Sequence, residues 1–130
     1  MEQKAKILYI EDNLDTQELI KIFLRPLAEV DCSINAENIL QLLSEKNYDL
    51  ILLDINLPGK IDGTDAIKLI RRDERFKDIP IIAVTAYAMI GDREKFLNMG
   101  CNEYIAKPFF KEELINKVKQ ILNQKLQEKS

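Results

Sequence analysis

The chain has 130 residues, 46% apolar and 32% charged, and its 19 basic and 22 acidic side chains give a net charge of −3. These values suit one domain with a core of ordinary size, and they lack the basic excess of a nucleic-acid-binding domain. No apolar run approaches the roughly 20 residues of a membrane span, and we expect no signal peptide.

The sequence contains no histidine. This excludes a catalytic histidine, a histidine-ligated zinc site and a phosphohistidine on this chain. Cys32 and Cys101 lack the spacing of metal ligands, so we expect both to be free, buried thiols.

Apolar residues 7–10 predict a first strand, which ends at Glu11-Asp12-Asn13. Asp12 or Asn13 is well placed to cap the helix that follows. A second strand is predicted over residues 30–34. The apolar positions with helical spacing are Leu19, Ile20, Phe23, Leu24 and Leu27 for the first helix, and Ala36, Ile39, Leu40, Leu42 and Leu43 for the second.

The third predicted strand is the unbroken apolar run 50–53, which leads to Asp54. Because apolar and polar residues do not alternate, this strand is expected to be covered on both faces, as in the centre of a parallel sheet. A loop with Pro58, Gly59 and Gly63 follows. The third helix then carries Ala66, Ile67, Leu69 and Ile70.

Pro80 opens a fourth strand, residues 81–84, at a position where a strand tolerates proline. Thr85 ends this strand, and a helix is predicted to run to about Met99, with Gly100 as its stop. A fifth strand, residues 103–106, ends at Lys107-Pro108. The last helix carries the apolar residues Leu114, Ile115, Val118, Ile121, Leu122 and Leu126.

Five strands that alternate with five helices predict an α/β fold with a parallel sheet and helices on both faces. We expect one domain over residues 1–130, with an ordered core at about 4–124 and a loose tail at 125–130.

The strand ends carry the candidate site: Glu11 and Asp12, Asp54, Thr85 and Lys107. The carboxyl ends of parallel strands share one edge of the sheet, where sites form. Three carboxylates that meet there need a positive partner, which Lys107 or a divalent cation can provide.

Such a set favours phosphoryl transfer to Asp54. A carboxylate beside Mg²⁺ can attack phosphorus and form an aspartyl phosphate. Lys107, the Thr85 hydroxyl and the Ala86 N–H can bind the phosphoryl oxygens.

Five segments resemble, in order and spacing, the receiver domains of bacterial two-component response regulators over essentially the whole chain. They are Ile10-Glu11-Asp12-Asn13, Leu53-Asp54-Ile55-Asn56-Leu57-Pro58, Asp62-Gly63, Val84-Thr85-Ala86 and Lys107-Pro108-Phe109. The resemblance implies a flavodoxin-like, doubly wound sheet of strand order 2-1-3-4-5.

By this resemblance, Asp54 accepts a phosphoryl group from a partner histidine kinase or histidine phosphotransfer protein. Glu11, Asp12, Asp54 and the backbone carbonyl of Asn56 would bind Mg²⁺ or Mn²⁺. The protein would be a cytoplasmic signalling switch rather than a metabolic enzyme, although it would assist its own phosphorylation and dephosphorylation.

The resemblance also implies a conformational response. Thr85, Ala86 and Lys107 would sense the phosphate, Thr85 and Tyr104 would be the switch residues, and the Lys107–Pro108 bond would be cis. The fourth helix, fifth strand and fifth helix would bind a downstream protein effector, with no direct nucleic-acid or membrane partner. The protein would be a monomer or a weak, phosphorylation-linked dimer.

Two features bear on the site. The loop through Gly59-Lys60-Ile61 holds one residue more than is usual in the family, which affects its shape and partner docking. The resemblance implies that Asn56 and Tyr87 lie where side chains control the access of water, and we hypothesise that Tyr87 shields the acyl phosphate. An unchanged dephosphorylation rate in Tyr87→Ala would contradict this.

The residues present disfavour three other functions. A phosphatase or mutase with an aspartyl nucleophile would need a second aspartate as acid–base, where this chain has Asn56. A flavin carrier would need a Ser/Thr-rich loop after the first strand, where Glu11-Asp12 would repel phosphate. A phosphorylation-independent interaction module usually lacks the phosphate-accepting aspartate or the site lysine, and this chain has both, as Asp54 and Lys107. The sequence does not distinguish a stand-alone regulator, a relay intermediate or the receiver of a hybrid kinase or transcription factor.

Overall fold

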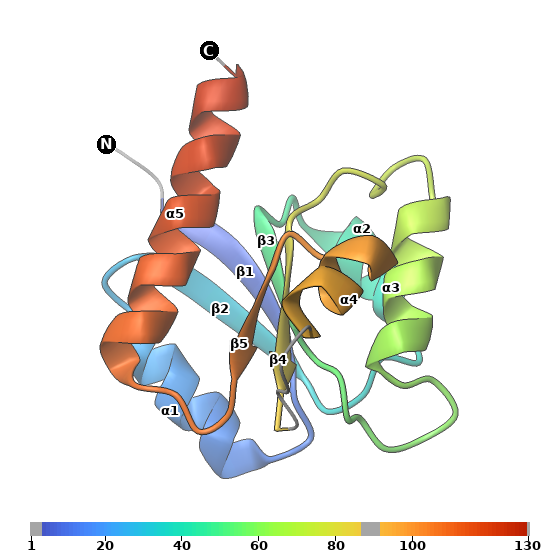
Figure 1. The fold of residues 1–130 in the computed structure, drawn as a ribbon, viewed down its shortest axis with the longest axis horizontal. Coiled ribbons are helices and arrows are strands. Elements are labelled where there is room, and N and C mark those ends of the chain that lie inside the picture. The colour runs from blue at the N-terminus through green and yellow to red at the C-terminus, as the bar shows by residue number, and fades with distance from the viewer. Residues whose placement is uncertain (1–3, 87–91, 130) are drawn as a thin grey trace.

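The computed structural model describes residues 4–86 and 92–129, which form a five-stranded parallel sheet with helices on both faces (Figure 1). The strand order is β2-β1-β3-β4-β5, which confirms the predicted doubly wound α/β fold. In chain order the elements are β1 (Ala5–Ile10), α1 (Leu14–Leu24), β2 (Ala28–Ser33), α2 (Ile39–Glu45), β3 (Leu50–Asp54), α3 (Gly63–Arg72), β4 (Ile81–Thr85), α4 (Asp92–Met99), β5 (Glu103–Ala106) and α5 (Lys111–Lys129).

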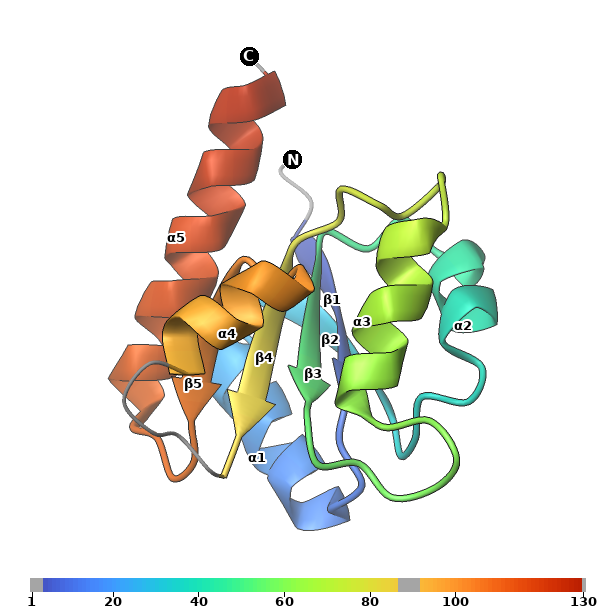
Figure 2. The ribbon, with the colours of Figure 1, turned by 45° about the vertical axis from the view of Figure 1, so that its right-hand side comes forward.

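The sheet separates two halves of the core. α1 and α5 cover one face, and α2, α3 and α4 cover the other (Figures 1 and 2). Successive side chains of a strand point to opposite faces, so Leu8 and Ile10 pack toward α2 and α3, whereas Ile7 and Tyr9 pack toward α1 and α5. All five residues of β3 and all five of β4 are buried, as expected for central strands covered on both faces.

Local signals fix several helix ends. Asn13, one of the two predicted caps, accepts a hydrogen bond from the Thr16 N–H at its Oδ1 and begins α1. Asp62 and Asp65 form a reciprocal capping box that begins α3. Gly100, at φ +116°, follows α4 and confirms the predicted stop.

Two boundaries differ from the prediction. β2 begins at Ala28 rather than at residue 30, and Ile34 lies beyond its end with 53% of its surface exposed. β2 is an edge strand whose charged residues give a weak pattern, so its length is decided by its register against β1. α1 ends at Leu24, because Pro26 has no N–H with which to continue the helical hydrogen bonds, and Leu27 therefore lies outside the helix.

Cys32 and Cys101 are both free, as expected, but only Cys101 is buried. Cys32 is half-exposed because it lies on the edge strand β2. The backbone of α5 stays helical to Lys129, through most of the predicted tail. None of the helices in the described residues is both long and apolar enough to cross a membrane.

Candidate functional site

The predicted site residues converge at the carboxyl edge of the sheet, where the arrows of β3, β4 and β5 end together in Figure 2. Asp54 is the last residue of β3, between β1 and β4. Thr85 ends β4 and pairs in register with Ala106, so Lys107 follows directly beside it. The parallel topology thus gathers groups from four separate segments.

Three carboxylates form the centre of the site. One oxygen from each of Glu11, Asp12 and Asp54 lies within 4.8 Å of the other two. Glu11 and Asp54 are 1% and 5% exposed, whereas Asp12 is exposed. Acidic oxygens at this separation, with one side open to water, are the ligand type that a hard divalent cation prefers.

Lys107 joins the two buried carboxylates. Its Nζ donates hydrogen bonds to Glu11 Oε1 at 2.5 Å and to Asp54 Oδ2 at 3.1 Å. One ammonium group is therefore shared by two negative charges and offsets only one of them. The site keeps a net negative charge, which a second cation could offset.

The two carboxyl groups respond differently to this arrangement. Burial raises the pKa of Asp54 above its usual value, helped by the charge of Glu11 and opposed by the Asn56 N–H and Lys107. Burial also acts to raise the pKa of Glu11, but hydrogen bonds from Lys107, the Asn13 N–H and the Tyr9 hydroxyl outweigh it and lower the pKa. Glu11 is thus the better-stabilised anion, and Asp54 carries the less stabilised charge.

The predicted phosphate-sensing and switch residues lie around this centre. Thr85 is 2% exposed, and Ala86 is exposed. Tyr104 lies opposite Ala83, two positions from Thr85, so both side chains leave the sheet on the same face. The half-buried Tyr104 ring packs on Phe96 of α4, with 5.7 Å between the ring centroids.

The remaining predicted positions are the cis peptide bond, the two residues expected to control water access, and the loop with the additional residue. The Lys107–Pro108 peptide bond is cis. Asn56 is exposed at the site, and its N–H donates to Asp54 Oδ1 at 2.9 Å. Tyr87 lies outside the described residues. In the loop with the additional residue, Gly59 adopts φ +100° and Ile61 packs against the core.

Sequence analysis missed Tyr9 and Gln17 as residues of the site, and it named Gly63 only as part of a loop and of the Asp62-Gly63 segment. The Tyr9 hydroxyl donates to Glu11 Oε1 at 2.9 Å, and Gln17 Nε2 donates to the Glu11 backbone oxygen at 2.6 Å. Gly63 lies against the chain just after β3 and donates its N–H to the Ile55 oxygen. Tyr9 carries a polar group within an apolar strand, a signal that does not identify its partner, whereas Gln17 lies among polar residues of α1 and gives no such signal.

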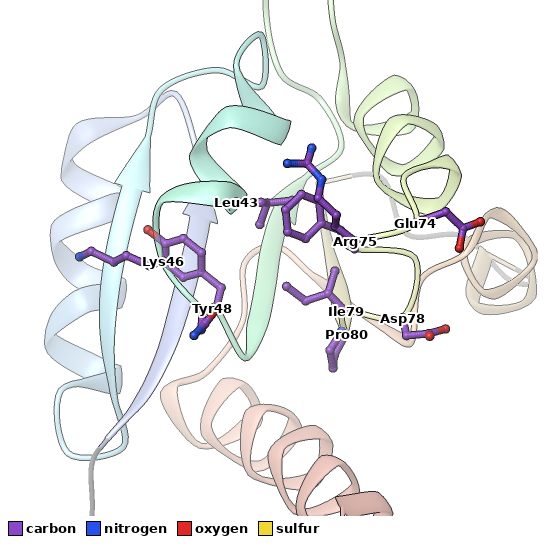
Figure 3. Close-up of a pocket in the computed structure, with 10 residues that line it drawn as sticks. Leu43, Lys46, Tyr48, Glu74, Arg75, Asp78, Ile79 and Pro80 are labelled. Atoms are coloured by element: carbon purple, nitrogen blue, oxygen red, sulfur yellow. The ribbon is translucent and has the colours of Figure 1, made fainter.

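The described residues line at least two hollows on the surface. An apolar groove of about 540 Å³ opens beside Lys107, between α1 and the segment that leads into α5. A second pocket, of about 470 Å³, lies at the opposite edge of the sheet (Figure 3). Its basic side chains are already paired, Lys46 with Asp31 and Arg75 with Asp73, so it offers no comparable chemistry.

Comparison with known proteins agrees with the geometry. Residues 7–119 match the family model described as the response regulator receiver domain. The chain is 35% identical over 117 residues to the polar-differentiation response regulator DivK of Brucella anthropi, which covers 89% of this chain and 94% of the relative. It is 39% identical over 93 residues to the probable transcriptional regulator ycf29 of Porphyra purpurea, but spans only 44% of that relative's length, against 72% of its own.

A solved structure supports the same comparison. The receiver domain of a sensor histidine kinase from Pseudomonas aeruginosa PAO1 superposes with a TM-score of 0.82 at 37% identity, over 93% of this chain and 99% of that one. That structure has a magnesium ion coordinated in the active-site cleft.

Proposed function

Because this chain belongs to the response regulator receiver family, we propose that Asp54 accepts a phosphoryl group from the phosphohistidine of a partner protein and thereby switches the contacts of its surface. The observation that carries the proposal is the convergence of Asp54 with Glu11, Asp12 and Lys107 at one edge of the sheet. The donor would be a histidine kinase or a histidine phosphotransfer protein, since the chain has no histidine of its own.

The residues present fit Mg²⁺. Glu11, Asp12 and Asp54 offer three carboxylate oxygens close together, the backbone carbonyl of Asn56 is the proposed fourth ligand, and the exposed Asp12 leaves room for water. When bound, the metal would neutralise the charge that develops on the phosphoryl oxygens. Mn²⁺ would serve in the same way.

The chain's own groups then have defined tasks. An oxygen of Asp54 attacks phosphorus as the bond from phosphorus to the donor's imidazole nitrogen breaks, so the histidine leaves and an acyl phosphate forms. Lys107 transfers one of its hydrogen bonds to a phosphoryl oxygen. The Thr85 hydroxyl and the Ala86 N–H bind other phosphoryl oxygens. Hydrolysis of the acyl phosphate would return Asp54 to its free form.

The response would pass through Thr85 and Tyr104. Both lie on the same face of the sheet, and Tyr104 packs on α4, so a movement of Thr85 toward the phosphate frees space for the Tyr104 ring. The surface of α4, β5 and α5 would then change its affinity for a protein effector. We place this cytoplasmic switch in a two-component pathway, as a monomer or a weak phosphorylation-linked dimer.

The decisive experiment is the intact mass after incubation with acetyl phosphate. Wild type should gain the mass of one phosphoryl group in the presence of Mg²⁺ and none with a chelator, because the carboxylate needs its charge offset to attack an anionic donor. The Asp54→Asn variant should gain nothing. If wild type stays unmodified while folded, a phosphorylation-independent interaction module becomes the better description.

A second test needs no phosphodonor. Mg²⁺ at ten times its dissociation constant should stabilise wild type by roughly 1.4 kcal/mol, since it binds only the folded site. The thermal unfolding midpoint measures this shift, and Asp54→Asn should lose most of it. An equal shift with Mg²⁺ in both proteins would place the metal elsewhere.

The same variant tests the electrostatics without metal. The folded pKa of Asp54 is raised, so the folded state binds more protons than the unfolded state and stability falls as pH rises through that interval. Asp54→Asn should therefore be more stable than wild type at pH 7, and the gain should vanish below the ordinary carboxyl pKa. Urea unfolding at both pH values measures it.

A related possibility is that the chain is the receiver of a larger sensor kinase. The Pseudomonas relative favours this context, because it is such a domain. Transfer of phosphate onward to a histidine phosphotransfer protein would distinguish a relay from a terminal switch.

A further inference from the structure

Tyr9 is a polar residue inside the hydrophobic core. It lies in the middle of β1, is 1% exposed, and packs with apolar residues of α1 and α5 such as Ile20 and Leu114. A phenylalanine would fill this space equally well. A buried hydroxyl lowers stability unless it forms a hydrogen bond. The role of the Tyr9 oxygen therefore lies in the hydrogen bond that it makes.

That contact is with Glu11. Residues two apart on a strand leave it on the same face, so the Tyr9 side chain follows the sheet toward the carboxyl edge. Its hydroxyl donates to Glu11 Oε1 at 2.9 Å, and both groups are buried. The hydrogen bond therefore joins the core to the group of three carboxylates.

The donors around Glu11 are distributed unevenly. Oε1 accepts from both the Tyr9 hydroxyl and Lys107 Nζ, whereas Oε2 accepts from the Asn13 N–H alone, at 3.2 Å. A carboxylate oxygen has about two acceptor positions. Oε1 is thus fully used, and Oε2 is the oxygen with capacity left for a cation.

The two donors to Oε1, Lys107 and Tyr9, differ in whether they can move away from Glu11. In the proposed reaction Lys107 turns to a phosphoryl oxygen on Asp54, so its contact with Glu11 weakens when the phosphate arrives. The Tyr9 ring is enclosed by the core and cannot follow. Its hydroxyl is then the side-chain donor that keeps the buried Glu11 carboxylate oriented.

We propose that Tyr9 is a positioning residue for the divalent cation: its hydroxyl holds Oε1 of Glu11 so that Oε2 faces the metal. This inference rests on the proposed function. Groups that orient metal ligands through hydrogen bonds typically change metal affinity 10- to 100-fold when they are removed. Such a residue acts through its ligand and does not touch the metal or the phosphoryl group.

The test is the Mg²⁺ affinity of Tyr9→Phe, measured by calorimetry with Mg²⁺ alone and no phosphodonor. We expect the dissociation constant to rise about tenfold, because Glu11 loses its fixed donor. With acetyl phosphate, the Mg²⁺ concentration for half-maximal phosphorylation should rise by the same factor, while the rate at saturating Mg²⁺ stays within about twofold of wild type.

Tyr48→Phe is the matched control. Tyr48 is also buried, and its hydroxyl donates to a carboxylate oxygen, Asp31 Oδ2 at 2.7 Å, away from the site. This variant loses the same atom and the same kind of hydrogen bond, so it reports any general loss of stability. Its Mg²⁺ affinity should equal that of wild type.

A double-mutant cycle with Glu11→Gln assigns the route of the effect. If Tyr9 acts through Glu11, adding Tyr9→Phe to Glu11→Gln should weaken Mg²⁺ binding far less than it does in wild type. An equal loss in both backgrounds, or an affinity of Tyr9→Phe within twofold of wild type, would overturn the inference. If wild type itself binds no Mg²⁺, the proposed function fails first, which separates the two results.

Discussion

Replacement of Lys107 by methionine should cost about 2–3 kcal/mol of stability at pH 7.5, because it leaves Glu11 and Asp54 buried without their shared cation. Methionine keeps most of the side-chain volume, so the loss is mainly electrostatic. The value is below that of a fully enclosed ion pair, since the Lys107 side chain is 26% exposed. Urea unfolding without metal measures it.

The loss of stability in Lys107→Met should depend on pH. Without Lys107 the folded pKa of both carboxyl groups should rise, so the folded state binds more protons than the unfolded state. The difference from wild type should therefore be largest at neutral pH and shrink as the pH falls toward the ordinary carboxyl pKa. Mg²⁺ should recover part of the loss, because it supplies the missing positive charge at the same carboxylates.

Two further variants separate the loss of charge compensation at the site from a general effect of removing a lysine. Lys119→Met removes an exposed lysine of α5 and should change stability by no more than about 0.5 kcal/mol. Adding Asp54→Asn to Lys107→Met removes one of the two uncompensated charges and should restore stability. A loss in Lys107→Met that is the same at pH 4.5 and pH 7.5 would show that packing, rather than charge, is responsible.

Gly63→Ala should destabilise the protein by about 3 kcal/mol or more, because there is no space for a methyl group. A Cβ at Gly63 would lie 2.5 Å from Ile55 Cα and 2.7 Å from the Asp54 backbone oxygen. Both are main-chain atoms directly at the end of β3, and Ile55 is also held by its N–H bond to the Val84 oxygen. The backbone that carries Asp54 must therefore move.

The change should also reach the chemistry. Displacement of the main chain at Asp54 would shift its carboxylate relative to Glu11 and Lys107, so phosphorylation by acetyl phosphate should slow in whatever fraction stays folded. Denaturant unfolding and the initial rate of mass gain measure the two effects. Lys68→Ala, an exposed change on the same helix, should leave both unchanged; a Gly63→Ala protein as stable as wild type would show that the loop can retreat from β3.

The sequence by itself was sufficient to predict an α/β fold with a parallel sheet and to place the candidate site residues at the carboxyl edge of that sheet. The unbroken run that ends at Asp54 predicted a central strand, and the alternation of strands with helices predicted a parallel sheet. That topology brings Glu11, Asp12 and Lys107 to the same edge as Asp54, because parallel strands end together. These features depend on local periodicity and on chain direction, which one sequence contains.

The tertiary structure decided how these groups are connected. Lys107 lies 96 residues from Glu11 and 53 from Asp54 along the chain, yet its Nζ donates hydrogen bonds to both carboxylates. The choice of a core tyrosine as donor to Glu11, and the contact of Gly63 with the end of β3, likewise depend on distances of a few ångströms between packed segments. No local pattern determines such distances, since they follow from how the sheet and its helices pack as a whole.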